Sequence, residues 1–164
     1  EGAVRAAALL LGLPAVICRQ NVQYGGPNVN GGLIDRFLDI FYEAGEAFLP
    51  PDGPYILGPI HEDDIIASIP ALLGAADVPP PVVNWGGEPS SVEEWCSQLG
   101  ELTGVEPQFV ETNRAQAGIP VDLSKLETIT GPLRGVTLED GLRRMVAAHS
   151  STSHLRIRFV RTAR

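Results

Sequence analysis

Apolar residues recur at helical spacing along much of the chain, with polar or Gly/Pro-rich stretches between them. The first stretch is apolar on nearly every side and ends at Gly12 and Pro14, which stop a helix. Acidic or hydroxyl residues that favour helix starts precede three later stretches. The predicted helices are 1–11, 31–44, 62 onwards, 92–102, 123–130 and 138–146. Pro70 lies inside the third of these and predicts a kink or a late start there.

Short runs between these helices predict strands. Ala15–Cys18 is entirely apolar, as expected of a strand buried on both faces of a parallel sheet. Val82–Trp85 is a second predicted strand, and Phe109–Val110 is a shorter candidate. Because helices and strands alternate, the pattern predicts an α/β fold class.

Composition narrows the classes of partner. The chain carries a net charge of -8 over 164 residues, and its basic residues form no stripe before the last nine positions, so nucleic acid is not expected. No apolar stretch reaches the length of a membrane span, so no membrane is expected either. Cys18 and Cys96 have no metal-ligand spacing and are predicted to be buried free thiols in a reducing cytoplasm.

Four short segments stand out by their order along the chain. They are Gly12–Gly25, Ile60–Ile65, Val83–Glu94 and Asp122–Lys125. In that order they resemble the strand and loop after the catalytic helix, the hydrophobic-His-x-Asp-Asp segment, the late strand and helix, and the Asp-x-Ser-Lys stretch of one family. This is the extended short-chain dehydrogenase/reductase family, the NAD(P)-dependent epimerases and dehydratases, and the resemblance is to its carboxy-terminal portion.

The resemblance implies a fold and a function. The fold would be a partial Rossmann-like parallel sheet edge, with strands at Val16 and Val83, joined to a small, mainly helical substrate-binding lobe. This portion covers residues 1–149, and residues 150–164 are expected to form a polar and basic tail. The implied function is the substrate-binding portion of an NAD(P)-dependent epimerase, dehydratase or oxidoreductase. Its partner would be a small polar substrate, with a nucleotide sugar as one candidate.

The resemblance also indicates what the chain does not contain. No Gly-x-Gly-x-x-Gly follows a strand, and the family's Tyr-x-x-x-Lys pair would fall just before Glu1. No catalytic residue is therefore assigned in this chain. NAD or NADP is implied for the complete enzyme, and the missing amino-terminal Rossmann half would be a partner of this chain. Alone, the chain is expected to bind neither cofactor and to be inactive.

The candidate substrate-binding residues are Asn21, Tyr24, Asn84, Gly86 and Arg114. The first four follow predicted strands, where α/β sheets place their ligands. Arg114 could clamp a phosphate or carboxylate, and so could Arg134. The alternative for Asn21 and Tyr24 is a plain turn in which the tyrosine packs, and for Asn84 it is an Asx turn.

His61, Asp63 and Asp64 permit two interpretations. A metal site needs three or four convergent ligands, and no further histidine lies nearby in the sequence. A helix cap in which His61 bonds to the backbone explains the segment better, so no metal is expected.

Two alternatives stay open from the sequence alone. A non-catalytic module that binds a ligand or a partner could derive from the same fold. Unpaired strand edges could also be covered in a homo-oligomer.

Overall fold

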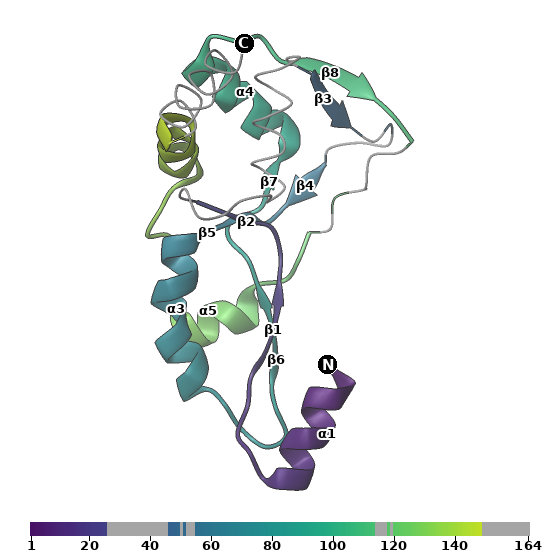
Figure 1. Ribbon diagram of the computed structural model, residues 1–164, viewed down its shortest axis with the longest axis vertical. Helices are drawn as coiled ribbons and strands as arrows, with labels where there is room; N and C mark the ends of the chain where they lie inside the picture. Colours follow the sequence, from purple (N-terminus) through teal and green to yellow (C-terminus); the bar gives the residue numbers. More distant parts are fainter. Residues whose placement is uncertain (26–45, 50, 52–54, 114–117, 119, 149–164) are drawn as a thin grey trace, which may run out of the picture.

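The structure is a computed structural model that describes residues 1–25, 46–49, 51, 55–113, 118 and 120–148. The predicted helix at 31–44, the predicted tail at 150–164 and Arg114 lie outside the described residues. Figure 1 shows α1 at one end of the molecule and α4 at the other, with strand pairs between them. The fold is α/β, as the alternation of helices and strands predicts.

The first helix, α1 (Gly2–Leu11), is the one predicted at the start of the chain. It ends at Gly12, whose φ of 61° and ψ of 30° are left-handed, and the Gly12 N–H donates to the Ala8 carbonyl oxygen. Glycine adopts this conformation without the steric cost that a Cβ brings. The chain can therefore reverse direction there and enter the first strand.

The strands β1 (Ile17–Gln20) and β6 (Val82–Trp85) form a parallel pair. The second is confirmed, but the first starts two residues later than the predicted Ala15–Cys18. Ala15 makes only an isolated antiparallel bridge with Asp77, whereas the ladder with β6 continues through the polar end of β1. Pairing with a distant strand, not hydrophobicity, sets where β1 ends.

Three further strand pairs lie nearer α4. β2 (Gln23–Tyr24) is parallel to β5 (Ile60–His61), β3 (Glu46–Leu49) is parallel to β8 (Gln108–Glu111), and β4 (Ile56–Leu57) is antiparallel to β7 (Ser90–Ser91). The short strand predicted at Phe109–Val110 is confirmed within β8.

Three predicted helices correspond to α3 (Glu62–Gly74), α4 (Val92–Thr103) and α5 (Ser124–Thr130). The helix predicted at 138–146 is present over 138–148. α4 begins with the predicted capping box. The Ser91 hydroxyl accepts from the Glu94 N–H, and the Glu94 carboxylate accepts from the Ser91 N–H. Thr137 caps the helix at 138–148 by accepting from the Asp140 N–H.

Pro70 does not delay the start of α3, so that part of the prediction is wrong. The helix begins at Glu62 and continues past Pro70 to Gly74. Pro70 is exposed, so water can hydrate the carbonyl that its missing N–H leaves without a donor. The acidic first turn and the cap decide where the helix begins.

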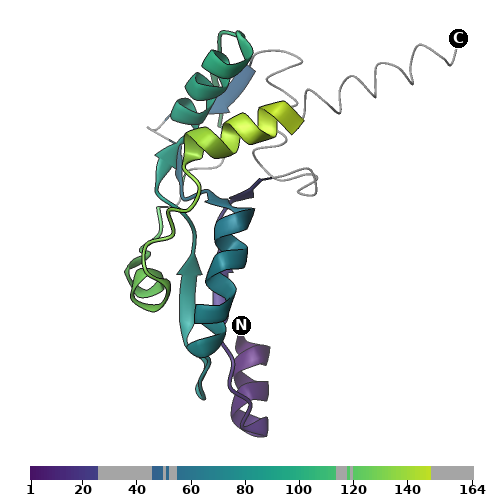
Figure 2. The same ribbon diagram turned by 90° about the vertical axis from the view of Figure 1, so that its left-hand side faces the viewer.

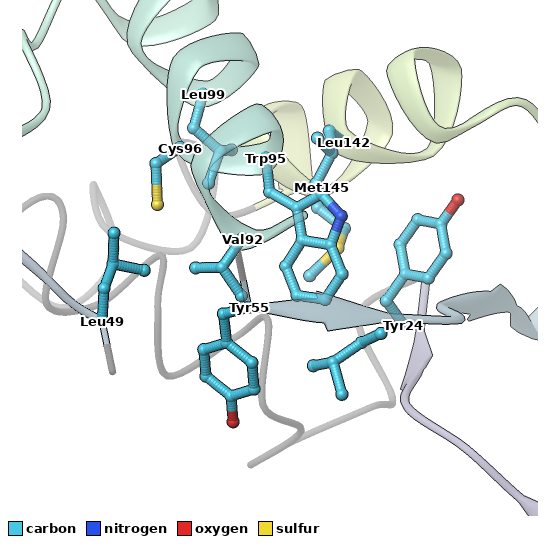
Figure 3. Packing of buried hydrophobic residues seen from close by; sticks show 10 residues of the cluster. Tyr24, Leu49, Tyr55, Val92, Trp95, Cys96, Leu99, Leu142 and Met145 are labelled. Carbon is cyan, nitrogen blue, oxygen red and sulfur yellow. The ribbon is translucent and has the colours of Figure 1, made fainter. Parts of the chain in front are cut away.

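Two clusters of buried apolar residues form the core. The larger gathers around α4 and the helix at 138–148 (Figure 3), and its buried members are Tyr24, Leu49, Tyr55, Leu57, Val92, Trp95, Cys96, Leu99, Leu142 and Met145. The smaller joins α3, β6 and α5 through Leu72, Val83 and Leu126. The interior positions predicted for α4 and for the last helix are thus confirmed at Trp95, Leu99 and Leu142.

Large apolar side chains are exposed on α1 and α3, which lie one beyond the other on the same side of β6 in Figure 2. Leu10 is 84% exposed on α1, and Leu73 is 65% exposed on α3. The other large apolar residues exposed on and just after these helices are Val4, Leu9, Leu11, Leu13, Ile66 and Ile69. Within the described residues, no helix has the length and hydrophobicity needed to cross a membrane.

Candidate functional site

The candidate site is built at the carboxyl ends of β1 and β6. Asn21 follows β1, and its N–H donates to the Trp85 carbonyl oxygen at 2.8 Å. Gly86 follows β6, and a Cβ placed there would lie 3.0 Å from the Gly58 carbonyl oxygen and 3.4 Å from the Asn21 Cβ. The Asn21 carboxamide oxygen accepts from the Val22 N–H at 2.8 Å, so this side chain also fixes its own turn. The structure therefore brings Asn21 and Gly86 together.

A second backbone crossing lies beside Gly86. The Gly87 N–H donates to the Gly58 carbonyl oxygen at 3.2 Å, and a Cβ on Gly87 would collide with the Pro59 carbonyl oxygen. Only a residue without a side chain fits between the two segments at this point.

Asn84 fastens another segment to the sheet. Its Nδ2 donates to the Asp122 carbonyl oxygen at 3.0 Å, while the Lys125 Nζ donates to the Val82 carbonyl oxygen at 2.8 Å. The Asp122 carboxylate accepts from the Ser124 N–H, a bond that lowers the pKa of Asp122. The Asp-x-Ser-Lys stretch thus packs along β6 by hydrogen bonds, and the Asn84 amide takes part in that packing.

Tyr24 is buried beside His61. Only 2% of Tyr24 is exposed, and the two rings meet edge to face with their centroids 5.2 Å apart. Desolvation, followed by the nearby carboxylates of Asp64 and Asp140, raises the pKa of Tyr24 to about 12, although Arg144 opposes the rise. Tyr24 is a neutral packing residue at ordinary pH.

His61 caps α3. Its Nδ1 accepts from the Asp63 N–H at 3.1 Å, which confirms the cap predicted from the sequence. Across the described residues, no three His, Cys, Asp or Glu side chains converge as a metal site would require.

Asp64 joins α3 to the loop at 133–137. It is 6% exposed, and its two carboxylate oxygens accept from the Gly135 N–H at 3.0 Å and the Val136 N–H at 3.3 Å. A buried carboxylate is stable where backbone N–H groups satisfy it. This loop is therefore held against the first turn of α3.

A cleft of about 300 Å3 opens between the start of α3, α4 and the loop that Asp64 holds. It shares residues 87–89 and 133–134 with a smaller cavity of about 150 Å3 that reaches α5. The polar residues of the larger cleft include His61, Glu88, Glu94, Gln98, Arg134 and Thr137.

Several proteins of solved structure are similar to this chain, although no model of a known protein family and no curated protein matches it. A UDP-glucuronic acid 4-epimerase from Bacillus cereus, in complex with NAD and a fluorinated UDP-sugar, matches with a TM-score of 0.76 at 22% identity, over 93% of this chain and 50% of that one. A dTDP-glucose 4,6-dehydratase from Bacillus anthracis, in complex with NAD, matches with a TM-score of 0.72 at 20% identity, over 93% of this chain and 50% of that one. A Pseudomonas aeruginosa protein, RMD, complexed with NADPH, matches with a TM-score of 0.72 at 17% identity, over 92% of this chain and 52% of that one.

The chain has the same fold as the matching part of these solved structures. It spans about half the length of the solved structures that it matches. This confirms the fold that the four ordered sequence segments indicate.

Within this fold, the predicted site residues do not form one group. Tyr24 lines the larger cleft and Gly86 the smaller cavity, with Asn21 packed behind Gly86. Asn84 is turned toward Asp122. Sequence reasoning missed Gln98 and Thr137 as cleft residues, because their helices are marked in the sequence only by caps and apolar spacing.

The first prediction concerns the Asp64 clamp. Asp64→Asn replaces one acceptor oxygen by an amide NH2 group, so one of the two loop N–H groups loses its partner. We expect the free energy of unfolding to fall by about 1–3 kcal/mol, as for a buried hydrogen bond left unmade. The matched control is Asp63→Asn, which removes an exposed ion pair with Arg144 and should cost under about 1 kcal/mol. Urea denaturation measures both, and equal losses would contradict the clamp.

The second prediction concerns pH. A free tyrosine has a pKa of 10.0, and burial raises that of Tyr24 to about 12, so the unfolded state releases this proton first as the pH rises. The free energy of unfolding should therefore fall between about pH 10 and pH 12. Tyr24→Phe should remove this part of the alkaline loss and leave the part due to Cys96, whose pKa burial also raises to about 12. Denaturation curves across this range measure the difference, and parallel pH profiles would show that Tyr24 is not buried as described.

Proposed function

We propose that the chain is the substrate-binding, carboxy-terminal portion of an NAD(P)-dependent epimerase, dehydratase or related oxidoreductase of the extended short-chain family. The observation that carries this proposal is the epimerase and dehydratase fold, with a loop-lined site at the carboxyl ends of the parallel strands β1 and β6. Sheets of this class bind ligands at that edge. Asn21, Tyr24, Asn84, Gly86 and Arg114 remain our candidates for contact with the substrate or for shaping its pocket.

The substrate we propose is a small polar molecule, with a nucleotide sugar as the leading candidate. The support is that the similar B. cereus epimerase holds UDP-linked sugars. The two free cysteines are in keeping with a cytoplasmic setting.

The described residues do not fit NAD or NADP. A dinucleotide pyrophosphate is usually held at a helix N-terminus beside a Gly-rich turn, and the sequence has no such turn after a strand. The first turn of α3 carries Glu62, Asp63 and Asp64, and that of α4 carries Glu93 and Glu94, all of which repel phosphate. We therefore assign the cofactor, and the catalytic Tyr/Lys pair, to a Rossmann half outside this chain.

The surface of the chain supports such a partner. A two-stranded parallel sheet is unusual alone, because parallel sheets are normally covered on both faces. β1 pairs with β6 on one side only among the described residues, and α1 leads into β1 as a crossover helix would. Such a Rossmann half would add a strand beside β1 and cover the exposed leucines of α1 and the apolar stripe Ile66, Ile69 and Leu73 of α3.

A second candidate is a non-catalytic module that binds a ligand or a partner. The same apolar surface favours it, since a second copy of the chain could cover α1 in a homo-oligomer. In that case the chain would act without a cofactor.

The third prediction separates cofactor binding by this chain from binding by a complete enzyme. The isolated chain should show no binding of NADH or NADPH at micromolar concentration by nicotinamide fluorescence and calorimetry, because it lacks a phosphate-binding turn. A complete UDP-glucuronic acid 4-epimerase serves as the positive control. Micromolar binding by this chain would overturn the assignment of the cofactor to another half.

A further inference from the structure

The parallel pair of β3 and β8 has an open edge along β8, at the margin of the molecule in Figure 1. Among the described residues β8 pairs with β3 alone, and all four residues of β8 are exposed. Phe109 is 44% exposed and Val110 is 38% exposed. Parallel sheets are normally covered on both faces, and an exposed apolar edge recruits a further strand. The outer edge of β8 is therefore a place where a further strand would be stabilised.

The backbone groups that face outward at this edge follow from one hydrogen bond. The Thr112 N–H donates to the Leu49 carbonyl oxygen at 2.8 Å, so it points toward β3. N–H and C=O groups alternate in direction along a strand. Those of Gln108 and Val110 therefore face β3 as well, whereas those of Phe109 and Glu111 face away from it. A strand added here would bond to Phe109 and Glu111.

The side chains around this edge are acidic. Residues 92–113, which run from α4 through β8, include five glutamates and no lysine, arginine or histidine. Glu106 precedes β8 and Glu111 ends it, and both are exposed. Neither forms an ion pair among the described residues. A strand that carries arginines would be attracted to this edge.

The last part of the sequence has the matching pattern. Residues 155–161, which lie outside the described part of the chain, read Leu-Arg-Ile-Arg-Phe-Val-Arg. Apolar and basic side chains alternate through Phe159, which is typical of a strand with one apolar face. The segment contains three arginines and no acidic residue, and all 20 acidic residues of the chain precede it. Its charge is therefore complementary to that around β8.

The connection to this segment starts beside the same part of the fold. Val146, near the end of the helix at 138–148, packs against the apolar cluster that contains Leu49 of β3. The Cα of Leu49 is paired with that of Glu111 in β8. Residues 149–154 can span roughly 20 Å when extended, at about 3.3 Å per residue. Residues 155–161 can therefore approach β8 while the helix stays intact.

We propose that residues 155–161 dock along the outer edge of β8 in the same chain and add a third strand to the β3–β8 pair. The added strand bonds to the outward backbone groups of Phe109 and Glu111, as in other cases of strand addition to a sheet edge. Its arginines lie beside the carboxylates of Glu106 and Glu111. The interaction needs neither a substrate nor a cofactor, so it goes beyond the proposed function and does not depend on it.

NMR on the isotope-labelled full chain tests the docking directly. We expect backbone NOEs between residues 155–161 and β8. Amide exchange should be slow at Phe109 and Glu111, which the added strand covers, as well as at Gln108 and Val110, which β3 already covers.

A charge reversal in the segment tests its recognition by the acidic edge. Arg158→Glu should speed exchange at Phe109 by about fivefold, the scale of an exposed ion pair that is lost. Exchange at Val110 should stay slow, which verifies that β3 and β8 remain paired. Combining Arg158→Glu with Glu111→Arg should restore slow exchange at Phe109. Arg164→Glu makes the same change of charge outside the segment and is the matched control, expected to leave both rates unchanged.

Three results would overturn the proposal. Fast exchange at Phe109 and Glu111 in the unaltered full chain, without NOEs to residues 155–161, would show that the edge of β8 is open. NOEs found only between chains that carry different isotope labels would place the segment on a second copy, which contradicts docking within one chain. Equal exchange rates at Phe109 in Arg158→Glu and Arg164→Glu would show that the arginines of the segment do not recognise this edge.

Discussion

The crossing of two backbone segments at Gly58–Pro59 and Gly86–Gly87 is the constraint on which the rest of the structure depends. No side chain separates the segments, because the Gly87 N–H donates directly to the Gly58 carbonyl oxygen at 3.2 Å and a Cβ on Gly87 would collide with Pro59. The loop after β6 leaves the parallel pair here and enters the part built around α4 (Figure 1). A larger residue at this point would push the two segments apart.

The candidate site follows from this crossing. Asn21 lies against Gly86 because β1 and β6 are paired up to Gln20 and Trp85, and the Gly58 carbonyl oxygen packs against the same glycine. Asp64 adds a second link by holding the loop at 133–137 against α3. Between these two links the cleft remains, lined by groups from α3, α4 and that loop. Backbone contacts and one buried carboxylate thus set the shape of the ligand-accessible surface.

Helix caps and stop residues in the sequence correctly predicted where several helices begin or end. The capping box at Ser91, the cap at His61 and the left-handed Gly12 act within a few residues, so α4, α3 and the end of α1 follow from the sequence. The residues that form β1 are set by its pairing with Val82–Trp85, far away in the chain. The apolar run at its start therefore did not predict where the strand ends. The cleft was missed for the same reason, since its walls come from segments that meet only in the fold. The alternation of helices and strands predicted the α/β fold class, and the four segments in their order indicated the more specific fold by resemblance.

The central claim is that this chain holds one part of a parallel sheet whose next strand belongs beside β1. Hydrogen exchange at single amides tests it most directly. The N–H groups of Ile17 and Asn21 donate to carbonyls of Pro81 and Trp85. Because N–H groups alternate in direction along a parallel strand, those of Cys18 and Gln20 face away from β6. The account predicts slow exchange at Ile17 and Asn21 and fast exchange at Cys18 and Gln20 in the isolated chain. Equally slow exchange at all four would show that the outer edge of β1 is already covered, and would contradict the claim.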